Sequence, residues 1–154
     1  MKYWLMKSEP DVFGIENLRQ EPNGRALWDG VRNYQARNYI RAMQPGDKAF
    51  FYHSSCPEPG IAGIMSIASE AYPDPTQFDP DDHHYDPKSI RDTPRWSAVD
   101  VEFRERFATP VFLYRLRKEK RLKGLVILRR GNRLSITPVT PAQWKYINKL
   151  AYST

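Results

Sequence analysis

The chain of 154 residues contains one cysteine, Cys56, and no long hydrophobic run. A single thiol forms no disulfide framework, and without a matching set of cysteines and histidines it builds no structural zinc site. No apolar stretch approaches the roughly 20 residues that cross a bilayer, and the N-terminus lacks the zones of a signal peptide. We therefore expect a soluble, cytoplasmic protein without a membrane partner, folded as one domain of residues 1–154.

The sequence motifs of common nucleotide and ester hydrolases are also missing. No G-x-G-x-x-G or G-x-x-x-x-G-K-[ST] segment is present to hold phosphates, and no G-x-S-x-G segment surrounds a serine. We expect a binding protein without a cofactor rather than a catalyst. An enzyme acting on a nucleotide is the alternative, with His53, Ser8, Glu9 or Cys56 as its candidate groups.

One cluster of side chains with metal-ligand chemistry occurs between residues 79 and 86. The cluster consists of Asp79, Asp81, Asp82, His83, His84 and Asp86. Its spacing matches neither the H-E-x-x-H helix of zinc proteases nor the twelve-residue calcium loop. We therefore predict that this cluster holds no functional metal.

Charge is divided unevenly along the chain. Residues 1–100 contain 11 lysines and arginines against 15 acidic residues, whereas residues 101–154 contain 13 against 3. The corresponding net charges are −4 and +10. Such asymmetry favours a polyanionic partner, most often nucleic acid, and a solvated basic surface is the alternative.

Turn signals and alternating apolar residues divide the chain into strands and short helices. Strands are expected at 3–7, 25–28, 48–53, 61–71, 96–107 and 133–139, and helices at 13–19, 33–43, 110–123 and 141–150. Thr140, Pro141 and Gln143 have the arrangement of a capping box for the last helix. The pattern predicts an α+β fold of about six mostly antiparallel strands, curved or closed towards a barrel and flanked by helices.

Residues 72–95 form a long loop, rich in proline, aspartate, histidine and tyrosine and almost free of aliphatic side chains. Loops longer than about 15 residues in compact domains are usually functional lids or disordered segments. The aromatic residues Tyr72, Phe78 and Tyr85 favour a packed lid.

Residues 28–43 combine aromatic rings with amide and guanidinium groups directly before a helix. Asn33 is a suitable N-cap, and apolar residues come late in the helix, so one end packs while the other is presented. This composition suits a planar polar ligand. Trp28 and Trp96 lie at element edges, where ligand contact and core packing are equally open, whereas Trp144 is expected in the core.

Five motifs stand out along the chain: Trp4-Leu-Met-Lys-Ser-Glu-Pro10, Trp28-Asp-Gly-Val-Arg-Asn-Tyr-Gln-Ala-Arg-Asn38, Gly46-Asp-Lys-Ala-Phe-Phe-Tyr-His-Ser54, Gly60-Ile-Ala-Gly63 and Trp96-Ser-Ala-Val-Asp-Val101. Together they resemble the EVE domain family, from the first strand to residue 138. The resemblance implies a PUA-like pseudo-barrel, similar to that of YTH and ASCH domains. It also implies binding of RNA or DNA, with a modified base held in an aromatic-lined pocket.

Carried over to this sequence, the resemblance implies a ligand site made of Lys7, Ser8, Glu9, Trp28, Val31, Arg32, Asn33, Tyr52, His53, Ser54, Tyr85 and Trp96. A flipped or single-stranded base needs stacking partners and directional polar groups, which such a set provides. Candidate phosphate contacts are Arg37, Arg41, Arg117, Lys118, Lys120 and Arg121. We therefore predict a non-catalytic reader of a modified nucleic-acid base. A binding module for a small anionic metabolite or nucleotide is the alternative.

Overall fold

The computed structural model describes residues 1–153, so that Thr154, the last residue of the expected domain, lies outside the described residues. The main elements are β1 (Tyr3–Ser8), α1 (Pro10–Phe13), α2 (Ile15–Gln20), β2 (Arg25–Trp28), α3 (Tyr34–Ala42), β3 (Lys48–His53), β4 (Gly60–Ile67), β5 (Tyr72–Pro73), β6 (Ser97–Phe112), α4 (Leu113–Lys118), β7 (Ile136–Val139) and α5 (Pro141–Ala151). Short 3-10 helices lie between them at η1 (Pro22–Gly24), η2 (Pro75–Phe78), η3 (Lys120–Leu122) and η4 (Val126–Leu128). Among residues 1–153, no helix combines the length and the apolar character needed to span a membrane.

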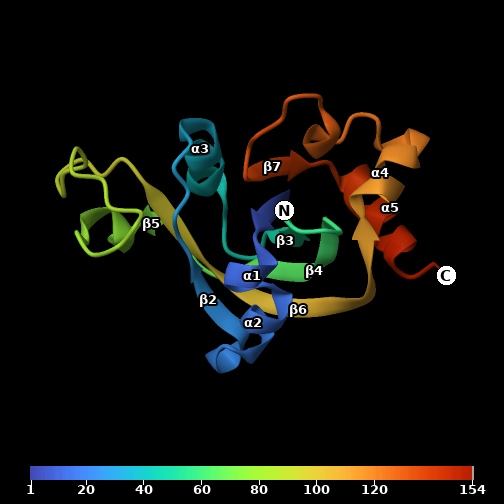
Figure 1. The fold of residues 1–154 in the computed structure, drawn as a ribbon, viewed down its shortest axis with the longest axis horizontal. Helices are drawn as coiled ribbons and strands as arrows, with labels where there is room; N and C mark the ends of the chain where they lie inside the picture. The colour runs from blue at the N-terminus through green and yellow to red at the C-terminus, as the bar shows by residue number, and fades with distance from the viewer. Residues whose placement is uncertain (154) are drawn as a thin grey trace.

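The strands form one mixed sheet in the order β2-β6-β4-β3-β1-β7, with β5 paired to β6. β1 and β3 run parallel, and the other pairings are antiparallel. Within the described residues β2 and β7 do not pair, so the sheet stays open. The 16-residue strand β6 curves along the molecule, from the long loop at one end to α4 at the other (Figure 1). The expected α+β fold with mostly antiparallel strands is confirmed.

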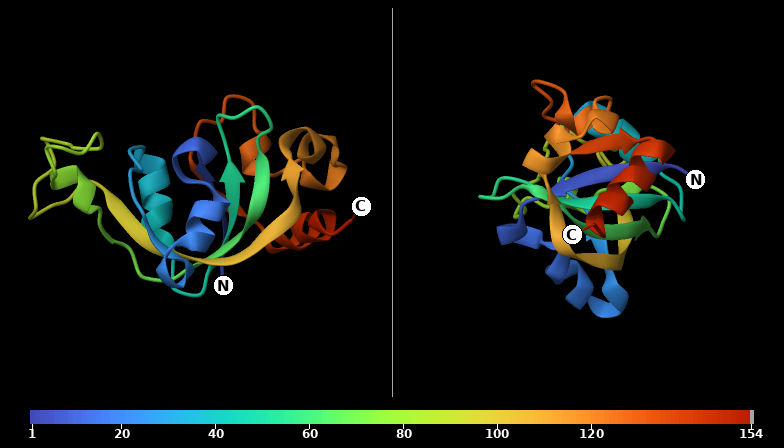
Figure 2. Two further views of the ribbon diagram at one scale, coloured as in Figure 1. Left: turned by 60° about the horizontal axis from the view of Figure 1, so that its bottom comes forward. Right: turned by 90° about the vertical axis from the view of Figure 1, so that its right-hand side faces the viewer.

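Both faces of the sheet are covered, because the central strands carry apolar residues on both faces. Side chains alternate along a strand, so Phe51 packs in one cluster and Phe50 in another. The Phe51 cluster includes Ile15 of α2 and Ile40 of α3. The Phe50 cluster includes residues of α4, η3, η4 and α5. The left view of Figure 2 shows α1 and α3 on the opposite side of β6 from α5.

Two helix starts agree with their sequence signals. The Oδ1 atom of Asn33 accepts the Ala36 N–H at 3.0 Å, and α3 begins at the next residue. Thr140 and Gln143 bond each other's backbone N–H groups at 3.1 and 2.9 Å, which completes the capping box of α5. Both predictions are confirmed. Each cap forms between residues a few positions apart, so it does not depend on the rest of the fold.

The helix expected at 110–123 is wrong in extent. It begins at Leu113 and ends at Lys118, and η3 follows it after one residue. The preceding strand β6 continues to Phe112, which pairs with Gly60 of β4. Long-range strand pairing thus overrides the local preference for helix over the first residues of this segment.

The strand expected at 61–71 is too long, since β4 ends at Ile67. Just after this end, the Asp100 N–H donates to the side-chain hydroxyl of Ser69, at 2.9 Å, instead of to a backbone carbonyl. A side chain that replaces a ladder acceptor ends the regular pairing.

Candidate functional site

A cleft of about 350 Å³ opens where β1 and β2 end. It is lined by Lys7, Ser8, Val12, Phe13, Leu27, Trp28, Asp29 and His84. An adjoining groove of about 440 Å³ is lined by Ser8, Glu9, Val12, Asp29, Asp82, His83 and His84. Three segments far apart in the chain therefore build the site: the end of β1 with α1, the end of β2, and the long loop.

Trp28 is the aromatic side chain of the cleft that the sequence singled out. It is 7% exposed, and its ring meets Phe51 edge-on with centroids 5.4 Å apart and planes at 81°. Phe51 is fully buried in the sheet, so the indole is held against a rigid support. The cleft thus has a fixed aromatic wall.

The two residues after Trp28 lie at the mouth of the cleft. Asp29 places a carboxyl group there, and Gly30 lies close to His84 of the long loop. The pKa of Asp29 is raised, first by the loss of surrounding solvent and then by the negative charge of Asp74. Gly30 has a φ of +79°, and a Cβ at this position would lie 2.6 Å from the His84 ring. Glycine therefore permits both the backbone turn and the approach of the long loop.

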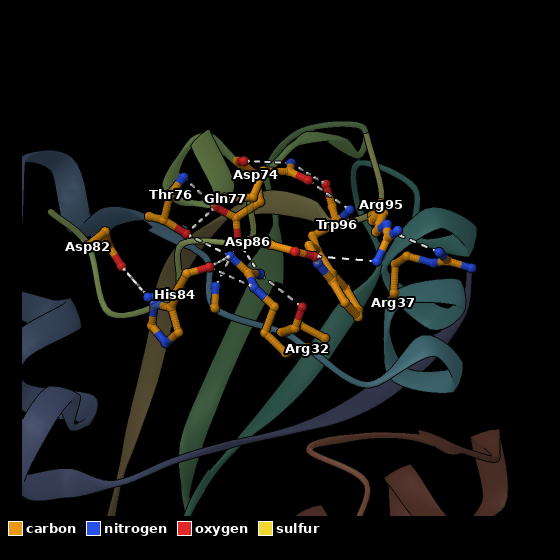
Figure 3. Close-up of polar contacts among 12 residues, drawn as sticks. Arg32, Arg37, Asp74, Thr76, Gln77, Asp82, His84, Asp86, Arg95 and Trp96 are labelled. Atoms are coloured by element: carbon orange, nitrogen blue, oxygen red, sulfur yellow. Dashed lines mark hydrogen bonds and ion pairs between the residues drawn. The ribbon is translucent and has the colours of Figure 1, made fainter. Parts of the chain in front are cut away.

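Asp74 fastens the long loop to this segment (Figure 3). Its fully buried carboxylate accepts the Gly30 N–H at 2.8 Å and a guanidinium N–H of Arg32 at 3.0 Å. Thr76 donates its backbone N–H at 2.8 Å and its hydroxyl at 2.6 Å. Burial alone would raise the pKa of Asp74, but these hydrogen bonds hold the pKa below its ordinary value. The carboxylate is therefore ionised and fully partnered.

Further polar contacts hold the rest of the long loop. Arg32 donates to the carbonyl of His84 at 2.9 and 3.1 Å. The buried amide of Gln77 donates to the Trp96 carbonyl at 2.9 Å and accepts the Trp96 N–H at 3.1 Å. The indole N–H of Trp96 donates to Asp86 at 2.8 Å. The loop is thereby packed against the start of β6, as Figure 3 shows.

Among the site residues implied by the resemblance, Lys7, Ser8, Glu9 and Trp28 line the cleft or its groove. His53 and Ser54 lie directly behind Ser8, whose carbonyl accepts the Ser54 N–H at 2.9 Å. The Nε2 atom of His53 accepts the Ile15 N–H at 3.1 Å, and burial lowers the pKa of this histidine. His53 is thus a neutral ring with its accepting nitrogen already used.

Two predicted aromatic residues lie away from the cleft. Tyr52 follows Phe51 in β3, so its side chain packs on the opposite face of the sheet, where burial raises its pKa to about 12. Trp96 is 6% exposed, and its ring stacks on Tyr34 with centroids 4.9 Å apart. Its indole is part of the packing under the long loop.

Four other predicted residues serve the fold or lie on the surface. Val31 is in the buried cluster around Phe51, and Asn33 uses its side chain as the cap of α3. Arg32 bonds the long loop, as described above. Tyr85 is 41% exposed on that loop. None of the four lines the cleft or the groove.

The predicted phosphate contacts fall into two groups. Arg37 donates to the carbonyl of Arg95 at 3.0 Å, and Arg41 donates to the hydroxyl of Ser97 at 2.9 Å, so both hold the end of the long loop. The second group is exposed and consists of Arg117, Lys118, Lys120 and Arg121. It lies on α4 and η3, whose apolar residues pack on the face opposite Trp28.

The candidate metal cluster contains fewer residues in the structure than the sequence suggests. The structure brings ligand atoms of Asp82, His83 and His84 within 4.8 Å of one another. Asp86 instead accepts the indole N–H of Trp96. The absence of a functional metal stays a prediction.

Sequence reasoning missed five residues of the cleft: Val12, Phe13, Leu27, Asp29 and His84, the last of which it considered only as a metal ligand. Asp29 lies inside the W-D-G motif, between two residues already singled out, so its carboxyl group could have been included. Val12 and Phe13 enter only because α1 folds back over the end of β1. The serine hydroxyl of Ser8 donates to the Phe13 carbonyl at 2.6 Å and fixes this turn.

A model of the EVE domain family matches residues 2–150. This chain belongs to the EVE family. Human thymocyte nuclear protein 1 is 46% identical to this EVE chain over 165 residues, covering 96% of it and 73% of the human protein. The resemblance drawn from the motifs is confirmed.

Solved structures of related proteins share the fold. A crystal structure of a Pseudomonas putida protein is 54% identical, with a TM-score of 0.94, covering 97% of this EVE chain and 99% of the other. A crystal structure of human THYN1 protein in complex with 5-methylcytosine containing DNA is 45% identical, with a TM-score of 0.95. It covers 100% of this chain and 99% of that chain.

Proposed function

We propose that this EVE protein binds DNA without catalysing a reaction, and that it holds a modified cytosine-class base in the cleft beside Trp28. The human THYN1 structure, which contains 5-methylcytosine DNA, supports DNA as the partner because the likeness extends over the whole chain. One feature of this chain carries the proposal: the cleft sets a rigidly held indole next to the carboxyl group of Asp29.

The cleft has the groups that a flipped base requires. Trp28 and Phe13 provide aromatic surface, and contact of this kind stabilises a base by about 1–3 kcal/mol. Asp29 can accept a hydrogen bond from an exocyclic amino group, a contact typical of cytosine. The volume of about 350 Å³ is at the small end of the range for ligand sites, which suits a base.

A methyl group on the base adds a modest free energy of binding. One buried carbon contributes about 0.8 kcal/mol, which is less than a tenfold preference. Leu27 and Val12 supply apolar walls that a methyl group can contact. We therefore expect the protein to prefer the methylated base. We also expect a measurable affinity for the unmodified base.

The two alternatives have less support from the site. A free anionic metabolite or nucleotide would meet Glu9, Asp29 and Asp82 around the cleft and groove, with Lys7 as the opposing cation. An enzyme using His53 as a base would need its Nε2 atom, which accepts the Ile15 N–H. Nucleic-acid binding without catalysis fits these contacts better.

The proposal is tested by titrating matched oligonucleotides that carry cytosine or 5-methylcytosine, as DNA and as RNA. We expect the methylated DNA to bind most tightly and to be recovered chemically unchanged by mass spectrometry. Trp28→Ala should weaken binding of the methylated DNA by about 5- to 150-fold, the equivalent of about 1–3 kcal/mol, and remove the preference.

Trp144→Ala is the control, because Trp144 is a partly buried tryptophan that also packs on the sheet. The ring of Trp144 stacks on Phe50 with centroids 4.0 Å apart, on the face opposite Trp28. Its removal should lower stability and leave the preference unchanged. A folded Trp28→Ala variant that keeps the preference would refute the proposed site, and an altered oligonucleotide would show catalysis.

A further inference from the structure

A basic loop between η4 and β7 carries Arg129, Arg130 and Arg133, all of them exposed. None of the three forms an ion pair with an acidic residue of the described chain, residues 1–153. Gly131 turns the loop with a φ of +76°, and a Cβ there would meet no atom within 4 Å. The loop is therefore an open turn that displays unpaired guanidinium groups.

The strand register places the end of this loop beside the cleft. Ile136, the first residue of β7, pairs with Met6 of β1. The next residue of β1, Lys7, lines the cleft and donates its N–H to the carbonyl of Ser135 at 2.8 Å. The end of the loop is thus one strand spacing, about 4.8 Å, from the cleft wall. Figure 1 shows the loop next to β7, the neighbour of β1 in the sheet.

Other cations are less well placed to contact a strand that enters the cleft. Arg32, Arg37 and Arg41 already donate to groups of the long loop or of the start of β6. The exposed cations of α4 and η3 follow β6, which is separated from β1 by β3 and β4 in the sheet.

We infer that Arg129, Arg130 and Arg133 bind the phosphates flanking the base held in the cleft. This inference rests on the proposed function and deepens it, because it assigns the backbone contacts to a loop that the sequence did not single out. A guanidinium group can donate two parallel hydrogen bonds to a phosphate. Such contacts fix the position of the strand and are the same for any base.

The test replaces the three arginines by glutamine, as Arg129→Gln, Arg130→Gln and Arg133→Gln in one protein. Affinities for methylated and unmethylated DNA are measured across a salt series, with the thermal midpoint as a check on folding. We expect both affinities to fall by about tenfold or more at 0.1 M salt, with their ratio unchanged. The logarithmic salt dependence should flatten by about 0.9 for each phosphate that the variant no longer binds.

A second protein, with Arg117, Lys118, Lys120 and Arg121 all changed to glutamine, is the matched control. It loses more positive charge, yet we expect a smaller loss of affinity and a smaller change in salt dependence. The single change Arg130→Gln, with an expected slope change of about 0.9, serves if the triple variant does not fold.

Outcomes for the loop and for the cleft are distinguishable. A folded loop variant with the affinity and salt slope of the unaltered protein overturns the inference, whether or not Trp28→Ala removes the methyl preference. A loop variant that loses only the preference overturns it as well. If the loop variant loses affinity while Trp28→Ala keeps the preference, the phosphate contacts stand and the cleft is wrong. If the unaltered protein binds no DNA, both proposals are refuted.

Discussion

Burial reduces the solvent around the Asp29 carboxyl group, and the negative charge of Asp74 repels its ionised form. A carboxyl group whose pKa is raised by folding costs stability as the pH rises from the unfolded pKa to the folded one, and the cost persists above that range. We therefore expect Asp29→Asn to raise the thermal midpoint at pH 7 and to leave it nearly unchanged at pH 3. The same change should weaken binding of methylated DNA, since the charged acceptor is removed.

The matched control is Asp92→Asn, an exposed residue on the same loop as Asp74. It should alter neither the midpoint nor the binding. Calorimetry at the two pH values, with one titration of each variant, gives the result. A lower midpoint for Asp29→Asn at pH 7 would show that the ionised carboxyl group is stabilised in the folded protein.

Gly30 and Gly131 separate the effect of backbone conformation from the effect of a close contact. Both have positive φ angles, of +79° and +76°, but only at Gly30 would a Cβ meet another residue, at 2.6 Å from His84. Gly131→Ala should cost about 1–2 kcal/mol from the backbone alone. Gly30→Ala should cost more, and it should displace the loop from the cleft.

The double variant Gly30→Ala with His84→Ala isolates the steric effect of the ring, because removing the ring leaves only the cost of the φ angle. In a protein that already carries His84→Ala, Gly30→Ala should then lower the unfolding free energy by about as much as Gly131→Ala lowers that of the unaltered protein. Denaturant unfolding measures the four variants and the unaltered protein. Equal effects of Gly30→Ala in the presence and absence of the His84 ring would refute the close approach of the ring.

At the scale of elements, one buried carboxylate fastens the start of the long loop to the segment that follows β2. Asp74 accepts hydrogen bonds from Gly30, Arg32 and Thr76, so its removal leaves a partly buried guanidinium group without its counterion. We expect Asp74→Ala to destabilise the protein by about 3–5 kcal/mol and to speed proteolysis within the loop. Asp92→Ala should stay within about 0.5 kcal/mol.

The same carboxylate gives a pH dependence. Because the pKa of Asp74 is lowered in the folded state, its contribution is complete above the unfolded pKa of about 3.8 and is lost as the pH falls through the folded value. The unaltered protein should lose more stability between pH 5 and pH 2 than Asp74→Ala does. Equal losses in the two proteins would contradict the lowered pKa. The pH endpoints are set by the linkage rule, at about one to two units on either side of the unfolded value.

Which elements the sequence predicts depends on the range of the interactions that form them. The caps at Asn33 and Thr140 act locally, and both helix starts were predicted. The extension of β6 to Phe112 depends on pairing with Gly60, about fifty residues earlier, so the local pattern could not reveal it. Because side chains alternate along a strand, the sequence could have predicted that Tyr52 and Phe51 face opposite sides of the sheet.

At the scale of the whole molecule, one sheet separates two buried clusters with different relations to the cleft. Phe50→Ala and Phe51→Ala each remove a fully buried ring and should each cost about 3–5 kcal/mol. Only Phe51 contacts Trp28, edge-on at 5.4 Å. We therefore expect Phe51→Ala to weaken the preference for methylated DNA and Phe50→Ala to keep it. Binding measured below both melting midpoints decides the matter, and identical preferences would show that the sheet does not hold Trp28 in place.

The position of β1 has a consequence for synthesis of the chain. Among the strands of this sheet β1 leaves the ribosome first, yet it lies between β3 and β7, and its partner in β7 begins at Ile136. At about 5–20 residues per second, the ribosome needs several seconds or more to make the intervening residues. Until then the nascent chain carries an unpaired strand edge, which another chain can use for pairing. Ribosomes stalled before residue 136 should therefore release this protein as an aggregation-prone fragment, whereas those that pass residue 139 release one in which β1 can pair on both of its edges.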